Sequence, residues 1–172
     1  MILEEIREGV VYVNGTSYFG AAETVKLPEI QFRTTERKPT GGIGVIELPG
    51  GGVDKMEMEI SWRSYDSGLA GSVFNPRAAT ALMIRSVKRT FDASGAISSE
   101  EAVVTHVTVV PKSFGLGEHK SGESIEVPNK FAVHAIKQVV GKKELVNIDV
   151  INQIMVIGGQ DLLANLRSIL GI

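Results

Sequence analysis

The sequence predicts a mainly β fold, an antiparallel β-sandwich or barrel with one or two short helices packed on it. Three observations support this prediction. Asn14 and Gly15 stand between two runs rich in strand-forming residues, and this pair favours the tight turn of a hairpin. The stretch Met56–Trp62 alternates apolar and polar residues without a break, as a half-buried strand does. Two longer runs, Ala79–Phe91 and Glu101–Phe114, are joined by the turn sequence Asp-Ala-Ser-Gly.

The N-terminal elements follow from local chemistry. Residues 1–9, MILEEIREG, carry three glutamates among apolar residues and lack the basic start and long apolar run of a secretory signal, so we expect an N-terminal arm. The hairpin then joins Val10–Val13 to Tyr18 and Phe19. Residues 24–32 follow as a strand. Pro28 cannot donate a ladder hydrogen bond, which places this strand at an edge or a bulge.

Residues 38–54, KPTGGIGVIELPGGGVD, contain six glycines and two prolines, which favours a long extended loop over a regular element. A loop of this length in a compact domain usually has a function. In the strand Met56–Trp62 that follows, the methionines, Ile60 and Trp62 share one face. Glu57, Glu59 and Ser61 share the other, so we expect one face in the core and the other against solvent or a partner.

The second half predicts further strands and two short helices. Residues 65–74 form a short helix that Gly68 and Gly71 weaken and that Asn75-Pro76 ends. Strands are expected within 123–140, at 144–148 and at 154–157. Residues 160–170 form a C-terminal helix whose apolar residues recur at helical spacing and need to be covered. These residues are Leu162, Leu163, Leu166, Ile169 and Leu170. We expect residues 1–172 to form a single domain.

Composition excludes several classes of function. The chain has no cysteine, which excludes thiol nucleophiles, thiolate metal sites and disulfides. Its formal net charge of -2 argues against a nucleic-acid clamp, because phosphate binding needs clustered lysine and arginine. No apolar run reaches the roughly 18 to 20 residues of a membrane-spanning helix. We therefore expect a soluble protein without a membrane anchor.

Searches for a reactive site find none. Gly42-Ile43-Gly44 and the stretch from Gly50 to Lys55 fail the dinucleotide and P-loop patterns, and glycines at these positions equally let a loop adapt to a surface. The three histidines, His106, His119 and His134, follow no metal-binding spacing. Glu57 and Glu59 lie on one strand face, whereas catalytic carboxylate pairs lie across a cleft. No catalytic residue, metal or cofactor is expected, which favours a structural or binding role.

Several stretches resemble one family. They are Val11–Gly20, Val25–Ile30, Gly117–Glu123, Gly141–Glu144, Ile148–Asn152, Gly159–Leu162 and Leu166–Gly171. Together they resemble the major tail tube proteins of contractile phage tails, including those of R-type pyocins, and the C-terminal segments are the most specific. The chain departs at Gly158, where the family often has asparagine, and at Ile172, where it usually ends in leucine. Residues 48–102 show little motif-level similarity.

The resemblance implies a non-enzymatic subunit with a phage tail tube-like fold. Such subunits close into hexameric rings with an inner β-barrel, and the rings stack into a tube whose lumen conducts DNA during ejection. The implied partners are further copies of the chain, the tail sheath protein, the tape measure protein, and the baseplate and tail terminator proteins. DNA passes transiently and without sequence preference. The implied location is the virion tail, assembled in the bacterial host cytoplasm. A type VI secretion tube protein and a small β-barrel ligand-binding protein are the alternatives.

Two groups of residues are candidate surfaces within such a tube. The arm and the glycine-rich loop are expected to pack on neighbouring subunits, although a plain surface loop would have the same composition. The residues are Ile2, Leu3, Gly41, Gly42, Ile43, Gly44, Val45, Ile46 and Leu48. Glu57 and Glu59 are candidates to face the lumen, where acidic charge would repel DNA phosphates. The alternative for these glutamates is the outer surface.

Overall fold

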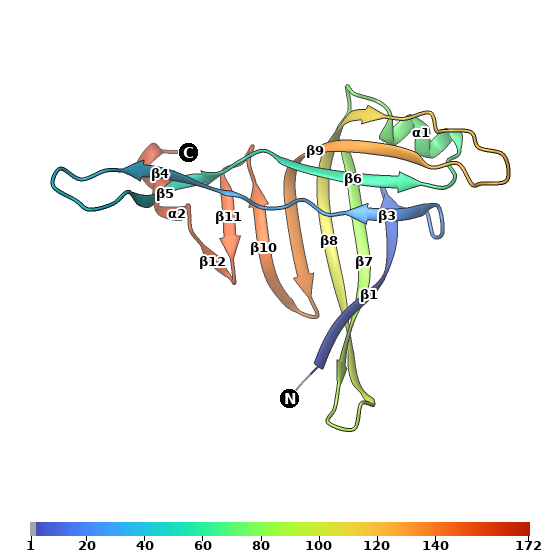
Figure 1. The fold of residues 1–172 in the computed structure, drawn as a ribbon, viewed down its shortest axis with the longest axis horizontal. Coiled ribbons are helices and arrows are strands. Elements are labelled where there is room, and N and C mark those ends of the chain that lie inside the picture. Colours follow the sequence, from blue (N-terminus) through green and yellow to red (C-terminus); the bar gives the residue numbers. More distant parts are fainter. Residues whose placement is uncertain (1–2) are drawn as a thin grey trace.

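The computed structural model describes residues 3–172 and is mainly β, with antiparallel strands and short helices, which confirms the predicted fold class (Figure 1). The strands are β1 (Leu3–Val13), β2 (Thr16–Ser17), β3 (Ala22–Lys26), β4 (Phe32–Arg37), β5 (Ile46–Val53), β6 (Met56–Trp62), β7 (Thr80–Phe91), β8 (Ile97–Phe114), β9 (Val127–Val140), β10 (Lys143–Asp149), β11 (Ile154–Ile157) and β12 (Gln160–Asp161). The helices are α1 (Ser67–Val73) and α2 (Ala164–Leu170). Among these residues no helix has both the length and the apolar character that crossing a membrane takes.

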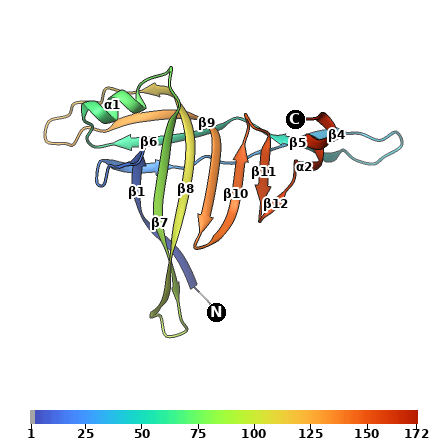
Figure 2. The ribbon, with the colours of Figure 1, turned by 180° about the vertical axis from the view of Figure 1, so that it is seen from behind.

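One large sheet forms the body of the described chain, and β4 and β5 form a separate hairpin. The order in the large sheet is β12-β11-β10-β9-β8-β7-β1-β2, and β6 joins β3 to β9. Strand β9 is the corner of the fold, because its first half pairs with β6 and its second half with β10. The register between β8 and β9 shifts at His134, where one extra residue bends β9 between its two partners. In Figure 2, β3 and β6 run across the direction of β7 and β8.

The core lies between the crossing strands. The apolar side chains of β6 are all buried, as their alternation predicts, and Trp62 is completely enclosed. They meet buried residues of β1, β7, β8 and β9, and Phe131 of β9 is also fully buried. Asn129 is a buried polar residue at this junction, and its side-chain oxygen accepts a hydrogen bond from Trp62 Nε1 at 3.1 Å. The core therefore depends on one polar contact as well as on apolar packing.

Local signals determine the smaller elements. The Asn14-Gly15 hairpin is confirmed: β1 and β2 pair on either side of it, and both turn residues adopt positive φ angles. Helix α1 is also confirmed. The Asp66 side chain accepts a hydrogen bond from the Leu69 backbone at the N-terminus of α1, and Leu69 and Val73 bury its apolar side.

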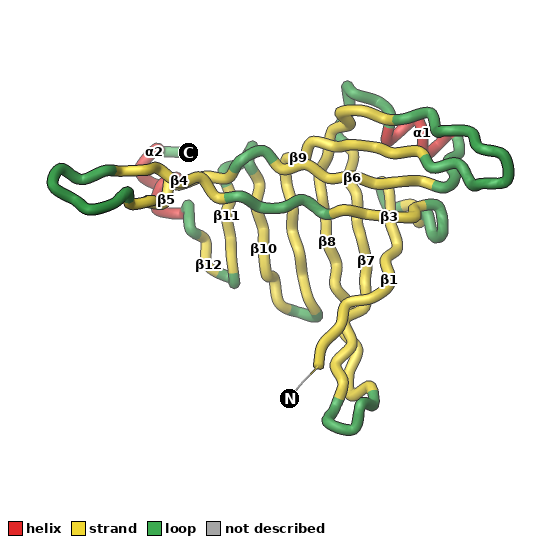
Figure 3. Tube along the Cα trace, viewed as in Figure 1, coloured by secondary structure: helices red, strands yellow, loops and turns green. Residues whose placement is uncertain are grey.

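In the part of the predicted N-terminal arm that the structure describes, the chain forms the start of β1. Leu3 to Arg7 pair with β7, from Phe91 to Val87. We call the resulting three-stranded ribbon the stem; it consists of residues 3–7, 87–91 and 97–102, and it extends away from the body (Figure 3). Two of the glutamates that indicated an arm, Glu4 and Glu8, form ion pairs with β7, and Glu5 pairs with Arg7 of its own strand.

The glycine-rich stretch 38–54 is not a loop throughout. Its second half, Ile46–Val53, forms β5 and pairs with β4, because Ile46 and Leu48 lie opposite residues that favour strands despite the later glycines. The strand predicted at 24–32 ends at Lys26, ahead of Pro28. The C-terminal helix starts at Ala164 rather than at residue 160, because Gln160 and Asp161 pair with β11.

Candidate assembly surfaces

The β4–β5 hairpin projects from the body (Figure 1), and only its base contacts the core, through Val53 of β5. All its strand residues except Gly52 and Val53 are exposed. Its two faces differ in chemistry. Ile46 and Leu48 lie on one face, opposite Arg37 and Thr35, and the other face carries the directly opposed pair Glu36 and Glu47. An isolated two-stranded hairpin is at best marginally stable in water, so packing on a further surface would stabilise this one.

Most of the predicted inter-subunit residues lie on this hairpin. Gly41, Gly42 and Gly44 form its turn, and Ile43 at the tip is fully exposed, with a relative accessibility of 110%. Val45, Ile46 and Leu48 are also exposed. Leu3 lies apart from them, at the end of the stem, so the structure does not bring the two predicted groups together. Ile2 lies outside the described residues.

Glu57 and Glu59 share the exposed face of β6 as predicted, but basic residues lie beside them. Lys112 and Lys55 form ion pairs with Glu57, and Lys130 lies 3.5 Å from Glu59. The hydrogen bond from Lys112, followed by the one from Lys55, lowers the pKa of Glu57, which therefore stays ionised at neutral pH. This face carries balanced charge rather than the net acidic charge that the strand sequence alone indicates.

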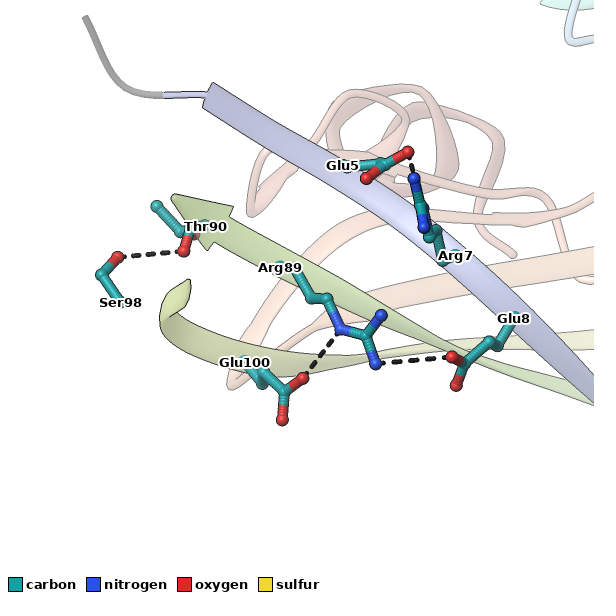
Figure 4. A network of polar contacts seen from close by, with 7 residues as sticks. All are labelled: Glu5, Arg7, Glu8, Arg89, Thr90, Ser98 and Glu100. Atoms are coloured by element: carbon teal, nitrogen blue, oxygen red, sulfur yellow. Dashed lines mark hydrogen bonds and ion pairs between the residues drawn. The ribbon is translucent and has the colours of Figure 1, made fainter. Parts of the chain in front are cut away.

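Ion pairs between charged side chains add to the backbone pairing of the stem (Figure 4). Arg89 of β7 donates from Nε to Glu100 of β8 at 2.8 Å and contacts Glu8 of β1 at 3.4 Å. Lys88 pairs with Glu4 at 2.9 Å. No residue of the stem is buried, so apolar packing contributes little to its stability. The sequence contained no signal for this network, because its partners come from three separate stretches.

Replacing Arg89 with glutamine is expected to loosen the stem without unfolding the body. Two cross-strand ion pairs disappear, and amide exchange in residues 3–7, 87–91 and 97–102 should rise about two- to five-fold, the range that exposed pairs support. Hydrogen exchange read by mass spectrometry measures this. Arg77→Gln is the matched control, since Arg77 makes no ion pair within the described residues. Equal amide exchange in the Arg89→Gln and Arg77→Gln variants would contradict the stabilising role of the Arg89 ion pairs.

The C-terminal helix exposes the stripe that the sequence predicts to need cover. None of the seven residues of α2 is buried, and the large hydrophobic side chains at the C-terminal end of the chain are exposed. They are Val150, Ile151, Leu162, Leu166, Ile169, Leu170 and Ile172. Leu163, just ahead of α2, does contact the core. A helix this short does not persist in water on propensity alone, and contacts such as the Arg167–Asp161 ion pair help to hold it on its own chain.

Both edges of the large sheet keep unpaired backbone groups. On one side β2 pairs only with Tyr12 and Val13, and the rest of β1 has no outer neighbour in the described chain. On the other side β12 pairs only with Val156 and Ile157 of β11. Open edges of this kind add strands from other chains readily. Strand β3, which pairs only with β6, leaves a further open edge, so the described chain offers several different edges for pairing.

The histidines lie apart from one another. His106 is exposed on β8, His134 occupies the bulge of β9, and His119 lies in the loop between β8 and β9. Across residues 3–172, no group of three histidine, aspartate or glutamate side chains is close enough to hold a metal ion.

Comparison with known proteins finds similarity to one family over nearly the whole chain. The family model for phage tail tube protein FII matches residues 4–171. The tail tube protein of Escherichia phage P2 is 29% identical over 167 residues, which cover 94% of each chain. A chain of the cryo-EM structure of an extracellular contractile injection system, the PVC sheath/tube terminator in its extended state, superposes with a TM-score of 0.57 at 11% identity, covering 76% of this chain and 92% of that one. A chain of the PVC sheath-tube complex in its extended state superposes with a TM-score of 0.56 at 11% identity, covering 76% of this chain and 87% of that one.

Proposed function

Since the chain belongs to the phage tail tube protein FII family, whose members are structural proteins of the virion tail and not enzymes, we propose that it forms the inner tube of a contractile tail. In this proposal the chain closes into hexameric rings. The rings stack around a lumen that conducts DNA during ejection. The observation that carries the proposal is the pair of open edges on opposite sides of the large sheet.

Two different edges on one chain suit a ring. The open part of β1 in one copy pairs with the β11–β12 edge of the next, and the large sheets join into a continuous barrel. Such a contact is heterologous, so each copy uses both of its edges and a rotation closes the ring. Closure removes the exposed edges that a monomer carries.

The uncovered surfaces then become contacts between copies. The hairpin residues Ile43, Val45, Ile46 and Leu48 pack on a neighbour, and the glycines of the turn let the tip follow that surface. The stem reaches toward another ring, which brings Leu3 and the N-terminal residues into the stacking contact. These elements project in different directions, which supports separate contacts around the ring and along the tube (Figure 3).

The exposed face of β6 is a candidate lining of the lumen. Glu57 and Glu59 form ion pairs with Lys112 and Lys130, and a surface of balanced charge attracts phosphates only weakly. DNA would pass such a surface without binding to it. The alternative location for this face is the outside of the tube.

The partners follow from the proposed tube. A sheath protein surrounds it, and the structural similarity to the PVC sheath-tube complex supports that arrangement. A tape measure protein fills the lumen before ejection, and baseplate and terminator proteins contact its two ends. Assembly takes place in the host cytoplasm. A type VI secretion tube, which carries effector proteins, is the second candidate, and the fold similarity to a contractile injection system favours it over a ligand-binding barrel.

Electron microscopy of the purified wild-type chain, with size-exclusion chromatography, tests the proposal. We expect six-fold rings stacked into long tubes. Isolated rings that never stack would favour the secretion-type tube, and a monomer that persists at high concentration would reject both. A reconstruction of the tubes also locates Glu57 and Glu59, and finding them on the outer surface would reject their proposed place in the lumen.

A further inference from the structure

The loop between β8 and β9, residues 115–126, holds a depression that the proposed function does not yet use. Its volume is about 500 Å³, and its lining includes Leu116, Glu118, Lys120, Glu123, Glu126 and Pro128. Three carboxylates against one ammonium give this lining a formal charge of -2. Leu116 adds an exposed apolar side chain at a relative accessibility of 71%. The depression thus combines acidic charge with an apolar contact.

The charges of the depression are only partly compensated within the chain. Lys120 lies 3.7 Å from Glu118. Glu126 lies within electrostatic reach of Arg63, whose pKa is raised first by its hydrogen bond to Glu23 and less by Glu126. Glu123 has no ion pair among the residues that the structure describes. The loop keeps negative charge available for a cation from outside.

Two contacts restrict the conformation of the loop between β8 and β9. The Gly115 backbone donates a hydrogen bond to the Pro128 carbonyl at 2.8 Å, which folds the loop back onto the start of β9. Gly117 has a φ of +93°, and a Cβ at this residue would lie 2.3 Å from Cγ2 of Ile125. Only glycine suits that position. These two contacts restrict the conformations of the loop, which lowers the entropy cost of binding.

The tip of the β4–β5 hairpin, residues 37–45, has the complementary chemistry. Its charged residues are Arg37 and Lys38, so its formal charge is +2. Neither forms an ion pair in the described part of the chain. Ile43 extends fully exposed from the same tip. Charge and apolar character both match the depression, with Ile43 corresponding to Leu116.

The two features lie at opposite ends of the long axis of the molecule (Figures 1 and 2). The tip therefore cannot reach the depression of its own chain, but it can reach that of a neighbour. A heterologous contact requires two different complementary surfaces on every copy. We propose that the hairpin tip of one copy docks into the β8–β9 depression of the next copy, in a head-to-tail contact. This inference rests on the proposed function, since it assumes that copies assemble.

Charge reversal on each side tests the contact. One variant carries Arg37→Glu with Lys38→Glu, so both its tip and its depression are acidic. The other carries Glu118→Lys with Glu123→Lys, so both are basic. Each variant alone meets like charge at every contact and is expected to lose at least about 90% of the assembled material, because a contact with like charges facing each other costs more than a tenfold loss of affinity. Circular dichroism checks that both remain folded.

Mixing the two variants restores the charge match. If they alternate around an even-numbered ring such as the proposed hexamer, every acidic tip meets a basic depression and every basic tip meets an acidic one. We expect the equimolar mixture to assemble to within about two-fold of wild type. Assembly of either variant alone at the wild-type level would overturn the inference. So would two defective variants that fail to rescue each other, since their surfaces would then contact something else, such as a sheath protein.

Cross-linking adds a direct readout, because the chain has no native cysteine. A variant with both Ile43→Cys and Leu116→Cys, treated with a short bismaleimide after assembly, should give a ladder of covalent multimers. Each single variant should stay monomeric or stop at a dimer. Assembled double variant without a ladder would overturn the contact while leaving the tube intact. Failure of the wild type to assemble would overturn the proposed function, and this inference with it.

Discussion

A chain in which residues 33–52 are replaced by Asn-Gly is expected to fold as a monomer and to lose tube formation completely. Phe32 and Val53 lie directly opposite each other in the β4–β5 pairing, so a two-residue turn connects them without strain. None of the strand residues removed with the hairpin is buried in the described chain. The free energy of unfolding should therefore change by no more than about 1 kcal/mol, since shortening a surface connection has a small entropic effect.

Loss of assembly follows because the deletion removes the apolar face that needs a neighbour. Urea denaturation measures the stability of the shortened chain, and sedimentation with electron microscopy measures its assembly. Normal tubes from this variant would refute the role of the hairpin. A monomer that no longer folds would show that the hairpin belongs to the core of its own subunit.

Substitutions on the two faces of the hairpin provide the matched control. Ile46→Thr with Leu48→Thr removes the apolar face and should raise the concentration needed for assembly more than tenfold. Glu36→Gln with Glu47→Gln changes the opposite face and relieves a like-charge pair, so assembly should persist. Equal effects of the two variants would contradict a contact made through the apolar face.

Replacing Asn129 with leucine is expected to destabilise the subunit by about 3 kcal/mol, because several buried polar groups lose their partner at once. The Asn129 side chain accepts from Trp62 Nε1 and donates to the carbonyl oxygens of Val73 and Ser113 at 3.5 and 3.4 Å. These partners belong to β6, α1 and β8. The substitution therefore weakens the junction where the crossing strands and α1 meet.

Urea denaturation followed by tryptophan fluorescence measures this effect, since Trp62 is the single tryptophan of the chain. Asn147→Leu is the control, because Asn147 is only half-buried on β10, beside the buried Ile148, and makes no side-chain hydrogen bond within the described residues. That variant should stay within about 0.5 kcal/mol of wild type. A similar loss of unfolding free energy in both variants would show that the hydrogen bonds of Asn129 do not stabilise the subunit.

Sequence reasoning was accurate where one strand or turn carries its own signal. Met56–Trp62 alternates without interruption, and the strand has those same bounds. The Asn14-Gly15 turn needs no distant contact, because its two residues accept positive φ angles by themselves. It failed at β5, where glycine content indicated a loop and pairing with β4 made a strand. The junction at Asn129 was not predicted either, since its partners are more than 15 residues away.

By itself the sequence determined the β-rich class, most strand positions, the short helices and the absence of any motif for catalysis. It also supplied the family resemblance that the family model confirms. Only the tertiary structure decided which surfaces stay uncovered: the hairpin, the stripe of α2 and the two sheet edges. The physical reason is that periodicity shows which apolar side chains share one face of a helix or strand. Whether that face is buried depends on which distant segments of the chain pack against it. In this chain those surfaces remain free for other copies.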